Sequence, residues 1–367
     1  MPETPSQDEG RWRFLAPPPG GAVEPAAAPP TFSVIVAAYN VADVIGDALA
    51  SLARQTVAPL EVIVCDDGST DDLEGALAPF AEEIVFLRQA QGGEAAAKNA
   101  AAGAARGDFL LVLDADDMFF PERVQALGEL AKARPDLDVL TTDAYLVVGD
   151  RRVRRNYDRR WTFEVADQRR AILQRNFVFG LAAVRRQRFL EHQGFDESIR
   201  WTTDWDLWLR LILDGSGVGA VDAPLALYRI RESSLTARRR ELTHGKIATL
   251  EKANRNGALT AADRSVVEEA LLAYRAELAV HELDASILGH DPAVRRQALA
   301  VARSPRVSVA RRLSALAVAA APRLTGRVVR RRAQSSWVGA GGTRVFRDGR
   351  VPLRTRISKW AGARDVG

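Results

Sequence analysis

Short apolar runs alternate with segments of helical period over the first third of the chain. Four β-branched or aliphatic runs are too short for buried helices, and each ends in polar residues, so we expect strands at residues 31–40, 60–67, 84–89 and 108–117. Three segments between them repeat apolar residues at helical spacing and predict helices at residues 41–55, 71–83 and 92–107. This alternation predicts an α/β fold with a largely parallel sheet and helices on both faces.

The pattern is less regular after Pro121. We expect a helix over residues 121–135, a strand over 137–148, a loop or hairpin over 149–161 and a helix over 201–215. One face of that last helix is expected to carry Trp201, Trp205, Trp208 and Ile212. The domain is expected to end near Thr236, and residues 261–288 again show a helical pattern.

Polar residues follow three of the predicted strands. These clusters are Tyr39-Asn40, Asp66-Asp67 and Asp114 to Asp116. Parallel strands place their carboxyl ends at one edge of a sheet, where ligands bind in such folds. Each cluster alone is as well explained by a solvated loop, but together they predict one binding site.

The stretch "DADD" places three carboxylates within four residues. On an extended strand Asp114 and Asp116 would lie on the same side, about 7 Å apart. Their repulsion is relieved by a divalent cation such as Mg²⁺ or Mn²⁺, which binds hard oxygen ligands and bridges them to phosphate. We assign Asp117 instead to the turn, as a cap of the helix after Pro121.

Composition describes an ordinary globular protein with one unusual end. Hydrophobic residues make up 47% and charged residues 27% of 367 residues, and the one cysteine, Cys65, fits a reducing compartment. Residues 1–30 lack a signal-peptide pattern and are expected to be a disordered leader, and no run is long enough to span a bilayer. Residues 291–367 hold 18 Lys and Arg against 3 Asp and Glu, a net charge of +15, and the remainder carries −11.

The sequence lacks the motifs of other common phosphate-binding and metal-binding sites. There is no GxxxxGK loop, CxxC pair or HExxH motif. "GSGVGA" at residues 215–220 follows a predicted helix instead of a strand and is expected to be an α-to-β turn. The four histidines are scattered.

Four motifs in order give the chain a recognisable resemblance. "FSVIVAAYN", "VCDDGSTDD", "AKNAAAGAARGDFLLVLDADD" and "TDWDLWLRL" resemble the family 2 glycosyltransferases over about residues 31–236. That resemblance implies a GT-A fold, with a Rossmann-like sheet, and an inverting, nucleotide-sugar-dependent enzyme.

The resemblance also implies roles for particular residues. Ala37, Ala38 and Tyr39 look like the nucleobase cradle, Asp67 supported by Asp66 looks like the acceptor of a hydrogen bond from the base, and Lys98 looks like a further nucleotide contact. Asp114 is expected at the ribose or metal, Asp116 as a metal ligand, and Asp204 as the general base, with Asp206 ranked second. A carboxylate in that role accepts the proton of the attacking hydroxyl.

Two positions depart from the family pattern. Thr203 stands where relatives often have Glu before the base, and Arg231 stands in a segment where they often have His. Arginine cannot ligate a metal, so Arg231 is expected to contact the diphosphate instead. The degree of metal dependence is therefore left open.

The prediction as a whole is an inverting glycosyltransferase that uses Mn²⁺ or Mg²⁺. Its donor is a nucleoside-diphosphate sugar, with a UDP-sugar first among the candidates, and its acceptor is a glycan or lipid-linked saccharide. The alternatives are a GT-A-like nucleotide-sugar-binding protein with weakened or lost catalysis, or a sugar-nucleotide nucleotidyltransferase.

Four segments are expected, with residues 1–30 as leader, 31–236 as the GT-A domain, 237–335 as a helical extension and 336–367 as a basic tail. We expect a cytoplasmic protein whose Arg-rich C-terminus contacts an anionic membrane. A solvated or partner-binding tail fits the same composition equally well. Nucleic acid is not expected as a partner.

Overall fold

The computed structural model describes residues 12–148, 151–158, 161–230, 235–255, 257, 259–289 and 291–321. Two features expected from the sequence, Arg231 and the basic tail at 336–367, lie outside these residues.

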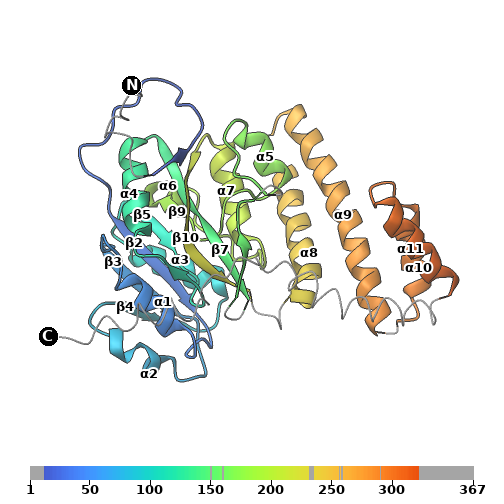
Figure 1. The fold of residues 1–367 in the computed structure, drawn as a ribbon, viewed down its shortest axis with the longest axis horizontal. Helices are drawn as coiled ribbons and strands as arrows, with labels where there is room; N and C mark the ends of the chain where they lie inside the picture. The colour runs from blue at the N-terminus through green and yellow to red at the C-terminus, as the bar shows by residue number, and fades with distance from the viewer. Residues whose placement is uncertain are drawn as a thin grey trace, which may run out of the picture.

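One mixed sheet forms the centre of the molecule, with strand order β1-β10-β7-β9-β5-β2-β3-β4 (Figure 1). Its strands are β1 (Phe14–Leu15), β2 (Phe32–Ala38), β3 (Glu61–Asp66), β4 (Val85–Arg88), β5 (Phe109–Val112), β7 (Leu137–Val148), β9 (Ala183–Arg185) and β10 (Gly217–Arg229). The short β6 (Met118–Phe119) pairs with β10, and β8 (Arg151–Arg155) pairs with β7. Six strands run in one direction, β4, β3, β2, β5, β7 and β10, and β9 lies antiparallel between β5 and β7.

Helices cover both faces of the sheet. They are α1 (Ile45–Leu52), α2 (Leu73–Leu77), α3 (Glu94–Ala104), α4 (Arg123–Ala133), α5 (Gln168–Gln174), α6 (Arg186–Glu191), α7 (Thr203–Leu213), α8 (Leu235–Asn254), α9 (Ala261–Gly289), α10 (Val294–Arg303) and α11 (Val309–Ala320), with a 3₁₀ turn η1 (Ala78–Phe80) after α2. Alternate residues of β2 serve the two faces, since Ile35 packs with α3 and α7 while Val34 and Val36 pack with α1 and α4. Both faces are apolar, as expected for a parallel sheet.

The expectation of a disordered leader is wrong for residues 12–30. Phe14 and Leu15 form β1, which pairs with Val221 and Ala220 of β10, and Ala26 N donates to the carbonyl of Lys132 at 2.8 Å. Trp12 and Phe14 pack on the core next to α4. The Pro/Ala-rich composition of this segment indicated disorder, and the few aromatic residues within it were given no weight. Burial of these aromatic side chains stabilises the pairing of β1 with the edge of the sheet.

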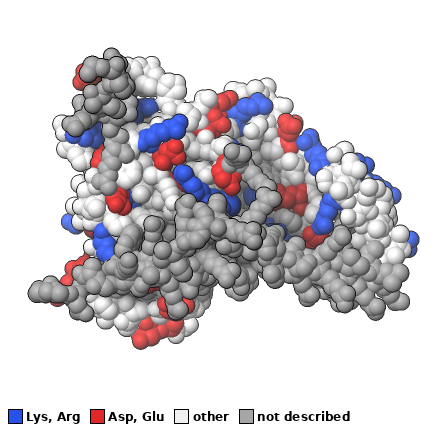
Figure 2. Space-filling model, viewed as in Figure 1, with Lys and Arg blue, Asp and Glu red and all other residues white. Residues whose placement is uncertain are grey.

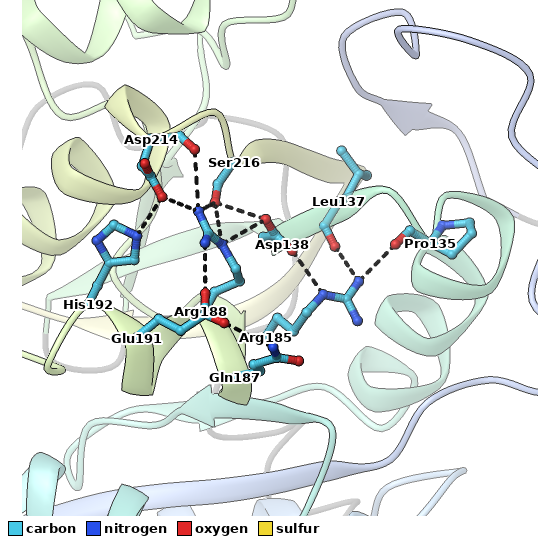
Figure 3. Close-up of polar contacts among 10 residues, drawn as sticks. All are labelled: Pro135, Leu137, Asp138, Arg185, Gln187, Arg188, Glu191, His192, Asp214 and Ser216. Carbon is cyan, nitrogen blue, oxygen red and sulfur yellow. Dashed lines mark hydrogen bonds and ion pairs between the residues drawn. The ribbon is translucent and has the colours of Figure 1, made fainter. Parts of the chain in front are cut away.

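A network of ion pairs fixes the sheet edge where β7 and β10 begin (Figure 3). Arg185 binds Asp138 at 2.9 Å and the carbonyls of Pro135 and Leu137, also at 2.9 Å. Arg188 binds Asp214 at 2.7 Å. Because this edge is opposite to the carboxyl ends of the parallel strands, the network anchors the scaffold away from the predicted site.

The C-terminal helices fall into two packing groups. Leu250 of α8 and Val267 and Leu271 of α9 are buried in the same core as α5 and α7. The end of α9 instead packs with α10 and α11 in a separate cluster that includes Ile287 and Val301. Figure 1 shows α8, α9 and then α10 and α11 following one another away from the sheet. The predicted domain boundaries stay predictions.

Within the part of the chain that the structure describes, every helix is too short or too polar to cross a membrane.

Candidate active site

The first two polar clusters meet where β2 and β3 end. The N–H of Asp67 donates to the carbonyl of Ala38 at 2.8 Å. Asn40, at a φ of 51°, accepts the N–H of Thr70 on its side-chain oxygen at 2.8 Å. Tyr39, between them, is 43% exposed, so its ring is accessible from solvent. The sheet therefore brings these predicted residues together.

Asp67 holds the loop that leads into α3. Its carboxylate is buried and accepts from Gln89 Nε2 at 2.8 Å, from Gly92 N at 2.8 Å and from Gly93 N at 2.7 Å. Gly93 has a φ of 97°, which other residues rarely adopt. The structure thus assigns Asp67 a loop-holding role, and its role in base recognition stays a prediction.

Asp114 and Asp116 lie on a turn. Strand β5 ends at Val112, and the N–H of Asp117 donates to the carbonyl of Asp114 at 2.9 Å. The expected extended geometry, with two carboxylates about 7 Å apart along a strand, is therefore wrong. The chain turns here because β6, which follows at once, pairs in the antiparallel direction with β10.

The assignment of Asp117 to a helix cap is also wrong. Its Oδ1 accepts the backbone N–H of Arg229 at 2.7 Å, which joins the turn to the end of β10. Its Oδ2 is buried and finds no hydrogen-bond donor among the described residues. Burial and the charges of Asp114 and Asp116 raise the pKa of Asp117 well above its usual range.

Lys98 lies between two acids. Its ammonium is 2.7 Å from Asp114 Oδ1 and 2.5 Å from Glu94 Oε1. Burial alone would lower the pKa of Lys98, but the charges of Asp114 and Glu94 outweigh it and raise that pKa. Burial raises the pKa of Asp114, and Lys98 opposes that change. The sequence analysis missed Glu94, which its i, i+4 spacing to Lys98 could have indicated.

The carboxylates on the turn fit a divalent metal ion shared with a diphosphate. Such ions are often held by one or two protein carboxylates, with phosphate oxygens and water completing the shell. Asp114 and Asp116 would supply two such carboxylates, and the buried Oδ2 of Asp117 lies in the same turn. Among the described residues, no cluster of three or more His, Cys, Asp or Glu is arranged to hold a metal.

Asp204 is half-buried in the first turn of α7. Its Oδ2 accepts from Asn176 Nδ2 at 2.9 Å, and a Cβ added to Gly180 would be 3.4 Å from that oxygen. Burial raises the pKa of Asp204 to about 6, against opposing effects of the Trp205 N–H and the charge of Lys98. The charge of Glu94 acts in the direction of burial, so both charged groups of α3 influence Asp204.

Asp206, the second candidate for the base, is two residues after Asp204 and forms buried ion pairs instead. It is 2% exposed, and its oxygens bind Arg210 at 2.8 Å and Lys252 at 2.7 Å.

The predicted tryptophan face is partly wrong, because Trp201 precedes α7 and is 37% exposed. Trp205 is buried in the core, with its Nε1 donating to the Ile172 carbonyl at 2.8 Å.

Tyr228 is a second residue that the sequence analysis missed. It is near the end of β10, and its ring meets Phe179 edge to face at 5.8 Å. Partial burial and the charges of Asp117 and Asp114 raise the pKa of its hydroxyl, with smaller effects from Asp116 and Asp204. Tyr228 is therefore influenced both by the acids of the turn and by the acid of α7. No local motif marks it.

Two solved structures are similar to this one over most of its length. TarS of S. aureus in complex with UDP-GlcNAc has a TM-score of 0.57 at 19% identity and covers 83% of this chain and 92% of its own. The mannosyltransferase PcManGT of Pyrobaculum calidifontis, in complex with GDP-Man and Mn²⁺, has a TM-score of 0.54 at 22% identity, with coverage of 89% and 90%. The structure therefore has the GT-A fold, as predicted.

The family follows from sequence comparison. Residues 33–192 match the model of Glycosyl transferase family 2. The succinoglycan biosynthesis protein ExoO of Rhizobium meliloti is 30% identical over 218 residues, and the uncharacterized glycosyltransferase EpsJ of Bacillus subtilis is 31% identical over 219 residues. Each match covers 56% of this chain and 63% of the relative. Residues 33–192 are therefore a glycosyl transferase family 2 domain, which confirms the predicted family.

The chain spans about three fifths of the length of the curated relatives that it matches. Its own donor, acceptor and partners are therefore taken up as proposals.

Proposed function

We propose that this protein is an inverting glycosyltransferase that moves a sugar from a nucleoside-diphosphate sugar to a hydroxyl of a glycan or lipid-linked saccharide. The observation that carries this proposal is Asp204, a half-buried carboxylate with a pKa of about 6 beside the charged groups at the carboxyl ends of the strands. A UDP-sugar is the first candidate donor.

Asp204 serves in this proposal as the general base. Inversion requires an acceptor oxygen to attack the anomeric carbon from the face opposite the leaving diphosphate. As the new C–O bond forms, the hydroxyl proton passes to Asp204, and the electron pair of the broken C–O bond leaves with the nucleoside diphosphate. A carboxylate with a pKa of about 6 is mostly ionised near neutral pH and is a stronger base than an ordinary aspartate.

The donor is proposed to bind along the ends of β2, β3 and β5. Ala37, Ala38 and Tyr39 hold the base, and Asp67 orders the loop beside it. Asp114 and Asp116 hold a Mn²⁺ or Mg²⁺ ion, which when bound neutralises the charge of the diphosphate.

Two cations complete the proposed donor site. Lys98 keeps Asp114 in place and contributes a positive charge close to the diphosphate. Arg231, which lies outside the described residues, is proposed to contact the diphosphate from the segment after β10.

We also propose a cytoplasmic location at an anionic membrane surface. Val309, Leu313 and Leu316 of α11 are 68%, 61% and 47% exposed and recur at positions i, i+4 and i+7, on one face. Residues 291–321 hold six Arg and one acid, and the visible end of the molecule around α10 and α11 shows Lys and Arg with little Asp or Glu (Figure 2). An apolar stripe with basic surroundings suits an interfacial helix.

Co-sedimentation with phosphatidylglycerol vesicles tests this location. Replacing Leu313 and Leu316 by Ser should weaken binding by about tenfold or more, because two exposed apolar side chains no longer enter the interface. The matched control is Leu272→Ser, which changes a leucine of α9 that is 49% exposed. Equal binding of both variants would count against the α11 surface.

Donor binding and turnover test the main proposal. Purified protein is titrated with UDP-, GDP- and dTDP-sugars with and without Mn²⁺, and nucleotide release is followed with candidate acceptors. We expect metal-dependent binding of one donor class and release of its nucleotide, and Asp116→Ala should remove the metal dependence. Binding without turnover for any acceptor would favour a nucleotide-sugar-binding protein, and no binding would refute the proposal.

A further inference from the structure

Asn176 has both ends of its amide fixed. Its Nδ2 donates to Oδ2 of Asp204 at 2.9 Å, and its Oδ1 accepts the backbone N–H of Val178 at 3.1 Å. The acceptor role of Oδ1 determines which end of the amide is nitrogen, so the donor points at the carboxylate. Asn176 therefore presents one N–H to Asp204 in a single orientation.

The segment that carries Asn176 is itself held in place from the other side. Trp161 Nε1 donates to the carbonyl of Asn176 at 3.2 Å. The hydroxyl of Tyr157 donates to the carbonyl of Phe177 at 3.0 Å and accepts the N–H of Phe179 at 3.1 Å. Both residues belong to the stretch that follows β8, which therefore holds the backbone of the Asn176 segment in place.

We propose that Asn176 is a positioning residue that binds Oδ2 of Asp204 and fixes the orientation in which this carboxylate accepts the proton of the attacking hydroxyl. This inference rests on the proposed function of Asp204 as general base. Without the amide, the carboxylate could rotate and either oxygen could take the proton, which would reduce the fraction of encounters with the correct geometry.

An amide suits this role because it does not titrate. Its N–H is a donor at every pH. The hydrogen bond that it gives to Asp204 favours the ionised form of the carboxylate and limits the rise in pKa that burial causes. Among the described residues, the charged or titratable groups that influence Asp204 include Lys98 and Glu94 from α3 and Tyr228 from β10. None of them is replaced when Asn176 is changed, so an effect on Asp204 can be assigned to the amide.

The test measures the pKa of Asp204 directly, in full-length protein labelled with ¹³C at the aspartate carboxyl carbons. The signal is assigned by its loss in Asp204→Asn and followed by NMR against pH. In Asn176→Leu, which removes the donor and keeps a similar volume, we expect the pKa of Asp204 to rise by about one unit. In Asn176→Asp, which has the same shape and adds a like charge, we expect a larger rise.

Asn99→Leu is the matched control. Asn99 also fixes a loop with both ends of its amide, since it donates to the Phe195 carbonyl and accepts the Phe195 N–H, each at 2.9 Å. This variant should lose thermal stability and leave the pKa of Asp204 within about 0.2 unit of the wild type. Asn176→Asp is retained as the working variant if Asn176→Leu does not fold.

An unchanged pKa in the Asn176 variants, or an equal change in Asn99→Leu, overturns the inference. If a donor has been found, the acidic limb of kcat/KM should move with the measured pKa, and kcat should fall about tenfold or more. Failure of the proposed function is distinguished because the NMR measurement needs no substrate: a shifted pKa together with full activity of Asp204→Asn would remove the base role and leave the contact with Asn176 intact.

Discussion

The two aspartates in the first turn of α7, Asp204 and Asp206, differ in their burial and in the groups that they bind. Asp204 is half-buried, binds one neutral amide and has a pKa raised to about 6 by burial. Asp206 is fully enclosed between Arg210 and Lys252 and holds α7 against α8. Their spacing in the sequence is compatible with either one as the base. The partners supplied by the tertiary structure separate a carboxylate available for chemistry from one used for stability.

Asp204→Asn should abolish transfer without destabilising the protein. We expect kcat/KM to fall at least about 10³-fold, with nucleotide affinity changed only a few-fold.

In the wild type, the pKa of about 6 in the folded protein exceeds the ordinary 3.8, so the contribution of Asp204 to stability is present at low pH and lost as the pH rises through 6. The variant should therefore be at least as stable as the wild type at pH 7.5, measured by thermal unfolding. Wild-type activity should rise between about pH 5 and 7 as Asp204 ionises.

Asp206→Asn is the control for that experiment. It leaves Arg210 and Lys252 without their shared carboxylate, and breaking a buried ion pair costs about 3 kcal/mol. The Tm should fall by about 5 °C or more. The pH at half-maximal activity should stay where it is in the wild type. A loss of activity in Asp206→Asn with normal stability would instead move the base to this residue.

At the scale of elements, the candidate site depends on the loops and turns that follow strands of the sheet. The loop between β4 and α3 is attached to the end of β3 by Asp67, and the turn after β5 is attached to the end of β10 by Asp117. Each attachment joins segments far apart in the sequence. A carboxylate that accepts backbone N–H groups satisfies donors that a loop would otherwise leave unpaired. Acids at the strand ends thus hold the loops of the proposed donor site in place.

Asp67→Ala should release the loop before α3. Three hydrogen bonds from Gln89, Gly92 and Gly93 are lost, so we expect a fall of about tenfold or more in affinity for UDP or GDP, measured by calorimetry. Hydrogen exchange at residues 89–94 should increase. Asp72→Ala, which removes the side-chain cap of α2, is the control and should change exchange only in α2. Unchanged nucleotide affinity in Asp67→Ala would exclude both proposed roles of Asp67 in the donor site.

At the scale of the whole molecule, the sheet and the first C-terminal helices form one structure. Tyr274 of α9 packs edge to face on Trp205 at 6.0 Å and donates to the Gln174 carbonyl at 3.0 Å. Arg169 of α5 pairs with Asp263 of α9 at 2.8 Å. Through these contacts α9 supports the helix that carries Asp204. The C-terminal extension is thereby part of the support of the site, while α10 and α11 have their own core.

Truncation after Thr236 should therefore prevent stable folding. It removes α8 and α9 and exposes the apolar surfaces that Leu250, Val267 and Leu271 cover. We expect insoluble protein or loss of a cooperative thermal transition. Truncation after Ala321 keeps every described contact and should leave the Tm within about 2 °C of the wild type. A soluble, cooperatively folded 1–236 protein would establish the predicted boundary as an independent domain limit.

The sequence by itself determined the alternation of strands and helices, the family and the edge of the sheet where the polar clusters gather. These features depend on local periodicity and on short motifs, which a linear chain displays directly. It did not determine the turn at Asp114 to Asp117, the pairing of β1 with β10, or the presence of Glu94, Asn176 and Tyr228 beside the predicted residues. Those depend on contacts between segments as many as 207 residues apart, as in the pairing of Phe14 with Val221, or 112 apart, as in the bond from Arg229 to Asp117. Only tertiary packing decides such contacts, because burial and the available partners of each polar group are properties of the folded chain.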